Sequence, residues 1–141
     1  MARAGKKQSV AFRFDSGLVE HLKRRASEAR EPQTQLAERY IAEGLRHDEH
    51  PLIYFRDGAA GRRPALLGSR LDVAAVISTI RQNDNSIEEA AEYLEVPIEQ
   101  VEAALRYYAD FKDEVDDWMA RTEAIAEHER SRWERQQQAL A

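Results

Sequence analysis

One short segment near the N-terminus constrains the fold of this chain more than any other. Residues 9–14 read S-V-A-F-R-F, so the apolar side chains of Val10, Phe12 and Phe14 occupy alternate positions. Strict alternation predicts a half-buried β-strand. Only helical patterns follow up to residue 51, so this strand has no partner nearby. An unpaired strand exposes both edges and so short a region cannot bury an adequate core. We therefore expect the strand to pair with the same strand of a second copy.

Two amphipathic helices are predicted after the strand. Apolar residues recur at helical spacing over residues 16–30, with Asp15 or Ser16 available as the N-cap. Pro32 ends this helix, because the residue before a proline disfavours the helical conformation. Thr34 is expected to cap the second helix, which continues to about Leu45. These elements define a predicted domain over residues 1–46, followed by a polar linker over residues 47–51.

A dimer built on the paired strands would place the apolar side chains in a shared core and the remaining side chains on the opposite face. A two-stranded ribbon fits the major groove of DNA, where Arg13 can donate two hydrogen bonds to guanine. The first turn of the second helix can bind a phosphate through its free N–H groups. Residues 1–30 carry eight Lys/Arg against three Asp/Glu, which favours a polyanionic partner. The predicted DNA-binding residues are Lys7, Ser9, Ala11, Arg13 and Thr34.

These residues resemble the ribbon-helix-helix family of DNA-binding proteins, which includes CopG, Arc and MetJ. The resemblance covers residues 8–46 and rests on S-V-A-F-R-F-D, then L-V-E-H-L, then P-Q-T-Q-L-A-E-R-Y-I. It implies an intertwined dimer whose strands read the major groove. The chain departs from the family between the two helices, where R-E-P-Q replaces a turn that often contains glycine. That departure places Glu31 close to the expected phosphate position.

A second unit is predicted over residues 52–118. Leu52–Arg56 and Pro64–Leu67 are expected to form the two strands of a β-hairpin. Three helices follow, and Ser86 with Glu89 has the pattern of a capping box at the start of the middle helix. Pro97 is expected in the first turn of the third helix. The apolar positions expected in the core of this unit are Leu71, Val73, Val76, Ile77, Ile80, Val101, Ala104, Leu105 and Tyr108.

Residues 86–108 have the spacing of a helix-turn-helix, but their charge argues against DNA contact. Glu99 and Glu102 stand at the start of the would-be recognition helix, where phosphates would repel them. We interpret this segment as a helical scaffold for protein contact. A second DNA-reading element is the alternative, with Arg106 as its one plausible basic contact.

The stretch from His50 to Trp118 is similar to small domains found in VapB-type antitoxins. The similarity rests on I-Y-F-R-D-G, G-R-R-P-A-L-L, S-I-E-E-A-A-E-Y-L-E-V and A-A-L-R-Y-Y-A-D-F-K-D-E-V-D. It implies a place in a toxin–antitoxin pair, with a PIN-like ribonuclease as the usual partner. It also implies that the C-terminal end of the chain wraps that toxin.

The C-terminal segment, from about residue 113 to residue 138, contains neither Gly nor Pro and predicts one amphipathic helix. Such a helix can dock in a groove of a partner, and tryptophan is enriched at interface hot spots. The predicted partner-binding residues are Trp118, Ile125 and Trp133. For Trp118, as for Val115 and Met119, burial in the domain's own core is the preferred alternative. Residues 119–141 are assigned to partner binding.

Several function classes are excluded or disfavoured. The chain has no cysteine, which excludes disulfides and thiolate zinc sites. No catalytic set, cofactor motif or metal cluster emerges, so we expect neither an enzyme nor a cofactor. No run of 18 apolar residues predicts a membrane helix. The apolar stretch behind the basic N-terminus is too short for a signal peptide, and a cytoplasmic protein is expected.

The predicted fold class is mainly α, with an N-terminal ribbon-helix-helix dimer and a C-terminal helical domain that carries a hairpin and a helix-turn-helix-like core. The leading hypothesis is an antitoxin that binds operator DNA as a homodimer, represses its own operon and neutralises a PIN-like ribonuclease toxin. Residues 83–141 carry six Lys/Arg against sixteen Asp/Glu, which suits a basic protein partner. The alternative is a free-standing repressor whose C-terminal domain forms higher oligomers or binds an effector. A scaffold protein without a DNA role is the third hypothesis.

Overall fold

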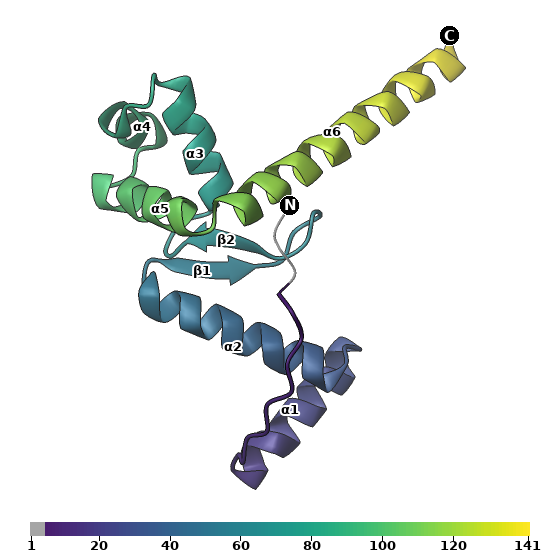
Figure 1. Cartoon of the computed structure of the whole chain (residues 1–141). Coiled ribbons are helices and arrows are strands. Elements are labelled where there is room, and N and C mark those ends of the chain that lie inside the picture. Colours follow the sequence, from purple (N-terminus) through teal and green to yellow (C-terminus); the bar gives the residue numbers. More distant parts are fainter. Residues whose placement is uncertain (1–4) are drawn as a thin grey trace. The chain divides into compact units, whose positions relative to one another are not determined.

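The computed structural model describes residues 5–141 and is mainly helical, with one two-stranded antiparallel sheet among these residues (Figure 1). This agrees with the predicted mainly α class. The chain divides after Pro51 into two compact units. We call them the N-terminal unit, which ends at Pro51, and the C-terminal unit, which begins at Leu52.

The N-terminal unit contains two helices, α1 (Ser16–Ala29) and α2 (Gln33–Glu49). Residues 5–15, which we call the arm, precede α1 and contain neither helix nor strand. The strand predicted over residues 9–14 is therefore not formed in the single chain. A β-ladder requires hydrogen bonds to a second strand, and the described part of this unit contains none.

Two details of the predicted helices are wrong. Helix α2 begins directly after Pro32, so Thr34 lies inside its first turn and does not cap it. The helix also continues to Glu49, so the expected linker over residues 47–51 is helical over its first three residues. The run after Leu45 is polar but compatible with a helix, and its last turn carries Arg46 and His47, which complement the helix dipole.

The start and end of α1 follow local chemistry. The Asp15 side chain accepts a hydrogen bond from the Gly17 N–H at 3.0 Å, which confirms the predicted cap. The helix ends at Arg30, whose φ of 55° is left-handed. An arginine thus adopts here the conformation that glycine adopts most easily.

The C-terminal unit begins with the predicted hairpin. Strand β1 (Ile53–Arg56) pairs antiparallel with β2 (Arg63–Leu66), with Ile53 opposite Leu66. The turn between the strands places Gly58 against the Arg63 guanidinium, where a Cβ atom would clash with Nη1. The same guanidinium lies 5.6 Å from the Trp118 ring centroid. Gly58 therefore leaves the space that the Arg63–Trp118 contact needs.

Four helices follow the hairpin: α3 (Val73–Gln82), α4 (Ile87–Leu94), α5 (Ile98–Asp110) and α6 (Lys112–Leu140). The Ser86 hydroxyl accepts from the Glu89 N–H at 3.1 Å, which confirms the predicted cap. The reciprocal half of the capping box is not formed, because the Ser86 N–H donates to the Asn83 carbonyl. Pro97 lies at the N-cap of α5 rather than in its first turn.

These helices and the hairpin enclose a single core. The prediction of the core positions is confirmed for Val73, Val76, Ile77, Ile80, Val101, Ala104 and Tyr108, whereas Leu71 and Leu105 are partly buried. Tyr107 was not predicted, yet it is completely buried and lies 4.7 Å, centroid to centroid, from the Phe111 ring.

Helix α6 belongs to the core only at its first turns. Val115 and Trp118 are buried, and no residue of α6 after Trp118 is. The rest of the helix extends away from α3, α4 and α5 (Figure 1). The boundary predicted between residues 118 and 119 therefore lies inside one continuous helix. No helix in the described part of the chain is long and apolar enough to cross a membrane.

Candidate nucleic-acid interface

The arm presents the predicted DNA-reading residues to solvent. Ser9, Ala11 and Arg13 are all exposed. The Phe12 and Phe14 rings stack at 5.6 Å between centroids, with 13° between their planes. Two side chains that are two positions apart can stack in this way when alternate residues share one side of the backbone. The arm thus keeps the two-sided pattern of a strand although it has no partner strand.

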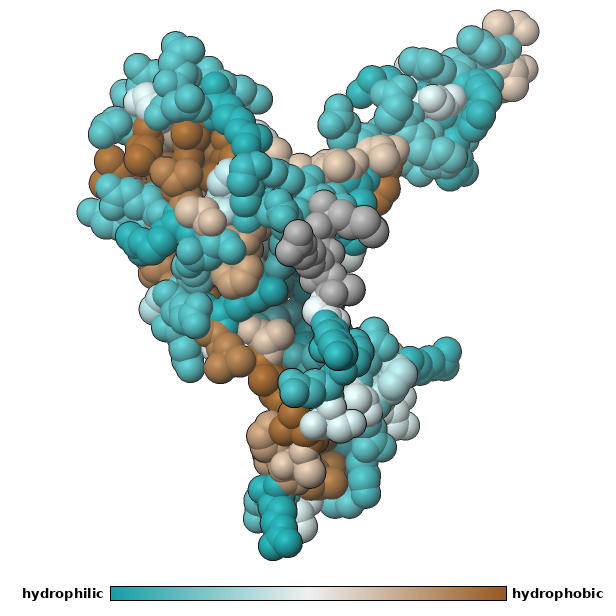
Figure 2. All heavy atoms as spheres, viewed as in Figure 1, coloured by the Kyte–Doolittle hydropathy of each residue, from teal (hydrophilic) through white to brown (hydrophobic). Residues whose placement is uncertain are grey.

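The apolar side of the arm faces an open groove in the N-terminal unit. Val10, Phe12 and Phe14 line it together with residues of both helices, and its volume is about 960 Å³. The residues that α1 and α2 contribute are Leu22, Gln33, Thr34, Ala37, Glu38, Ile41, Ala42 and Leu45. Figure 2 shows hydrophobic residues exposed over this unit. The groove is an apolar surface that the single chain does not cover.

Burial in the N-terminal unit is correspondingly small. Ala26 and Leu36 are its only buried apolar residues among those described. The large apolar side chains that remain exposed are Val10, Phe12, Phe14, Leu18, Tyr40, Ile41 and Leu45. A region of this size needs more buried apolar surface to fold stably. These exposed side chains are therefore available for contact with a further surface.

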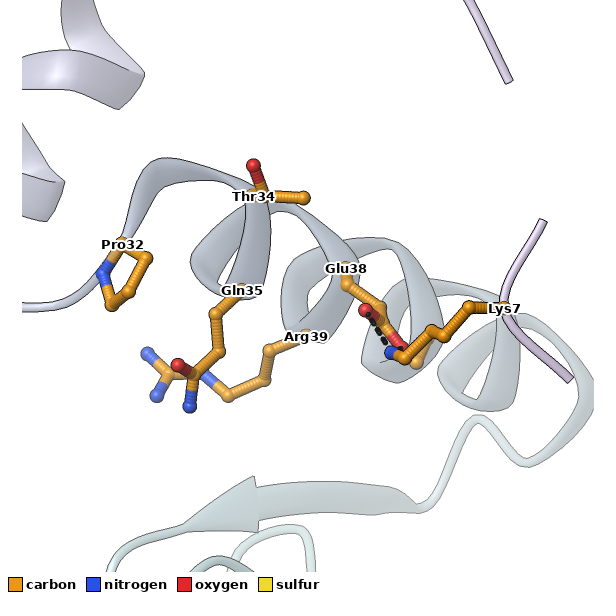
Figure 3. A pocket seen from close by; sticks show the side chains of 7 residues that line it. Lys7, Pro32, Thr34, Gln35, Glu38 and Arg39 are labelled. Atoms are coloured by element: carbon orange, nitrogen blue, oxygen red, sulfur yellow. Dashed lines mark hydrogen bonds and ion pairs between the residues drawn. The ribbon is translucent and has the colours of Figure 1, made fainter. Parts of the chain in front are cut away.

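Two residues of the predicted site, one from the arm and one from α2, border the same depression. Lys7 and Thr34 line the same open depression of about 630 Å³, whereas Ser9, Ala11 and Arg13 do not line it. Figure 3 shows the Lys7 side chain extended toward Glu38, whose carboxylate it meets at 2.9 Å. Sequence reasoning missed Glu38, because nothing in the sequence indicates a contact between residues 31 positions apart.

Glu31, which lies near the expected phosphate position, forms an ion pair with Arg39. Its carboxylate accepts two hydrogen bonds from Arg39 Nη1, at 3.0 and 3.2 Å. Both side chains are less than one third exposed, so solvent screens this pair less than the pairs at the surface. Arg39 reduces the repulsion that Glu31 would exert on a phosphate at the start of α2.

A further cation, Arg25, lies beside apolar side chains of both helices. The hydrogen bond from Arg25 to Glu28, and after it the one to the Tyr40 hydroxyl, raises the pKa of Arg25. Arg25, Tyr40, Leu18, Leu22 and His21 line a second open depression. The apolar side chains Leu18, Leu22 and Tyr40 thus lie beside an arginine that is paired with Glu28 at 3.1 Å.

The predicted partner-binding residues divide into two groups. Trp118 is 9% exposed and belongs to the core, so it is not available as a surface contact in the folded unit. Ile125 and Trp133 are 38% and 60% exposed on the half of α6 that extends beyond the core. Only these two can meet a partner without disturbing the unit.

The helix-turn-helix-like segment exposes its acidic side chains. The glutamates of α4, α5 and the turn between them that are exposed are Glu88, Glu89, Glu92, Glu95, Glu99 and Glu102. Within residues 5–141, no group of three or more His, Asp or Glu side chains is placed to hold a metal ion. Comparison of the chain with protein-family models, curated proteins and solved structures finds no match.

Proposed function

We propose that the protein is a DNA-binding homodimer whose paired arms read an operator sequence. The observation that carries this proposal is the two-sided arm. Its phenylalanines line an uncovered apolar groove, while Arg13 lies exposed at an intervening position. A second copy could pair with the arm and cover the groove in one step. The resulting ribbon would present Ser9, Ala11 and Arg13 twice.

The division of labour among the site residues follows from their chemistry. Arg13 is suited to reading guanine through two hydrogen bonds, Ser9 can bond to several bases, and Ala11 offers only a methyl contact. Lys7 and the first turn of α2 near Thr34 are suited to phosphates, which fix the position of the dimer but do not specify sequence. Two half-sites would be read by one dimer.

We further propose that this repressor is the antitoxin of a type II toxin–antitoxin pair in the cytoplasm. The sequence resemblance of residues 50–118 to VapB-type antitoxins suggests a PIN-like ribonuclease as the toxin. The exposed half of α6 supports a docking role, because it carries Ile125 and Trp133 without tertiary cover. The acidic charge of residues 83–141 suits a basic partner.

A free-standing repressor is the second candidate function, and the same observation favours it. An exposed helix of this kind can also pair with a copy of itself, which would join dimers into larger oligomers. No toxin is then required.

DNA reading is tested with Arg13→Ala on duplexes that the wild-type protein selects from a random pool. We expect a loss of about 1–3 kcal/mol for each guanine contact removed, together with relaxed sequence preference. Arg24→Ala, which removes an exposed charge of α1, should weaken binding to all sequences by a similar small factor. If the sequence selectivity of Arg13→Ala is unchanged, the paired arms do not recognise the DNA sequence through Arg13.

The partner is tested by co-purification of the tagged full chain from its native cell. The control is a chain that ends after Thr122, because truncation at Phe111 would remove Val115 and Trp118 from the core. A small basic protein that accompanies only the full chain supports the antitoxin. Self-association alone, lost on truncation, supports the free-standing repressor.

A further inference from the structure

The contact between Lys7 and Glu38 differs from two other exposed ion pairs of the N-terminal unit. The Lys7 ammonium lies 2.9 Å from each Glu38 carboxylate oxygen. The exposed pairs Lys23–Glu20 and Arg25–Glu28 join residues three positions apart on one helix. Those pairs can form in any α1 helix, whereas Lys7 can reach Glu38 only when the arm lies along α2. The pair therefore reports the position of the arm.

The same contact occupies a group that DNA binding would need. A lysine ammonium has three N–H donors and no acceptor, and two hydrogen bonds to Glu38 take up much of that capacity. A DNA phosphate at Lys7 would have to displace the carboxylate or lie beside it, where the two anions repel each other. Figure 3 shows Lys7 and Glu38 at one end of the depression that also contains Thr34.

We propose that Glu38 competes with DNA phosphate for Lys7 and so weakens DNA binding by the arm. This inference rests on the proposed DNA-binding function and adds its regulation. In the free chain, Glu38 holds the basic end of the arm against α2. On DNA, Lys7 transfers from the carboxylate to a phosphate and the start of the arm is released from α2.

The size of the effect follows from exposure. The Lys7 and Glu38 side chains are 84% and 63% exposed, so solvent screens their attraction strongly. Exposed pairs of this kind are weak, and releasing one changes an equilibrium by at most about fivefold. Glu38 thus lowers the affinity for DNA only modestly, and a polyanion can displace it from Lys7.

The first test measures binding of a random-sequence DNA duplex to four full-length proteins: wild type, Glu38→Gln, Lys7→Gln and the double variant. We expect Glu38→Gln to tighten binding about two- to fivefold and Lys7→Gln to weaken it. In the Lys7→Gln background, Glu38→Gln should change nothing. Equal tightening in both backgrounds would show a general charge effect and overturn the competition, and so would no tightening in either.

The second test needs no DNA. Trypsin cleaves after Lys6 and Lys7, and mass spectrometry follows the cleavage rate in the free protein. We expect Glu38→Gln to accelerate this cleavage, because the arm is no longer held. Glu20→Gln, which removes the same charge and breaks the Lys23 pair on α1, should leave the rate unchanged.

The two readouts separate the inference from the function on which it rests. If the wild-type protein does not bind the duplex, the proposed function is wrong. The proposed competition is then wrong as well, whatever the cleavage rates. If the protein binds the duplex but is cleaved equally fast with and without the Glu38 carboxylate, the proposed function stands. The proposed competition between Glu38 and DNA phosphate is then wrong.

Discussion

Single residues in this chain hold backbone conformations that glycine usually provides. Glu95 ends α4 with a φ of 56°, and its N–H donates to the carbonyls of Ala91 and Glu92. A side chain strains this left-handed conformation. The glutamate charge also lies at the C-terminal end of a helix, where the dipole disfavours an anion. Both effects destabilise the C-terminal unit in the same direction.

Replacing Glu95 with glycine should therefore stabilise the unit. We expect a net gain of about 0.5–1 kcal/mol, because relief of the left-handed strain outweighs the greater entropy of glycine in the unfolded chain. The gain is measured as a rise in Tm by circular dichroism. Glu95→Ala is the matched control, since it removes the charge and retains the strained Cβ. A Glu95→Gly variant no more stable than Glu95→Ala would show that the conformation costs nothing here.

At the scale of elements, α6 is fixed to the unit by a polar cluster at its start. The Tyr108 hydroxyl accepts from Arg81 at 2.6 Å and donates to Asp116 at 2.7 Å. Lys112 donates to the other Asp116 oxygen at 2.7 Å. These bonds join α3, α5 and α6. The hydrogen bond from Lys112, and then that from Tyr108, holds the pKa of Asp116 below its usual value.

This cluster predicts a specific dependence of stability on pH. A carboxylate with a lowered pKa in the folded state stabilises the protein above its unfolded-state pKa, and this contribution is lost as pH falls through the folded-state pKa. Asp116→Asn should therefore lower Tm at pH 7 and lose this difference under acid conditions. The group is partly exposed, so we expect an effect of at most about 1 kcal/mol. A constant Tm difference between the two proteins from neutral to acid pH would show that the Asp116 charge does not cause the stabilisation.

Local signals determined most of the elements correctly. Asp15 and Ser86 cap helices as predicted because a short polar side chain before an apolar repeat satisfies free N–H groups wherever the chain folds. The end of α2 was missed because residues 46–49 are polar without being helix breakers, and only Pro51 stops the chain. Tyr107 was missed because it lies one position beside the expected stripe on α5, whose buried face is wider than a simple periodicity indicates.

At the scale of the whole molecule, the two units differ in how much of their apolar surface a single chain buries. The core of the C-terminal unit was largely predictable, since its apolar residues meet one another within 90 residues of the same chain. The contacts of the arm were not predictable, because the arm can form a β-strand only when a second strand pairs with it, and a single chain does not supply that strand. Glu38 was unpredictable for a related reason, as its contact depends on where the arm comes to rest.

The uncovered face of the N-terminal unit leads to the last prediction, which concerns assembly. Phe12 is 65% exposed in the single chain. Full burial of a phenylalanine is worth about 1.5–3 kcal/mol, and a symmetric dimer buries two copies of it. Allowing for the part already covered, Phe12→Ser should weaken the dimer by about 2–4 kcal/mol, or about thirty- to a thousandfold in Kd. Sedimentation equilibrium measures this constant directly.

The C-terminal unit supplies the control for this experiment. It has its own core, so Phe12→Ser should shift the protein toward monomer while the Tm of that unit stays unchanged. Tyr93→Ser removes a side chain that is 72% exposed on α4 and should leave the dimer intact. A Phe12→Ser protein that remains fully dimeric would place the interface elsewhere, with the exposed half of α6 as the next surface to vary. The arm would then lack the partner strand on which DNA reading depends, and Arg13 would have to act from a single arm.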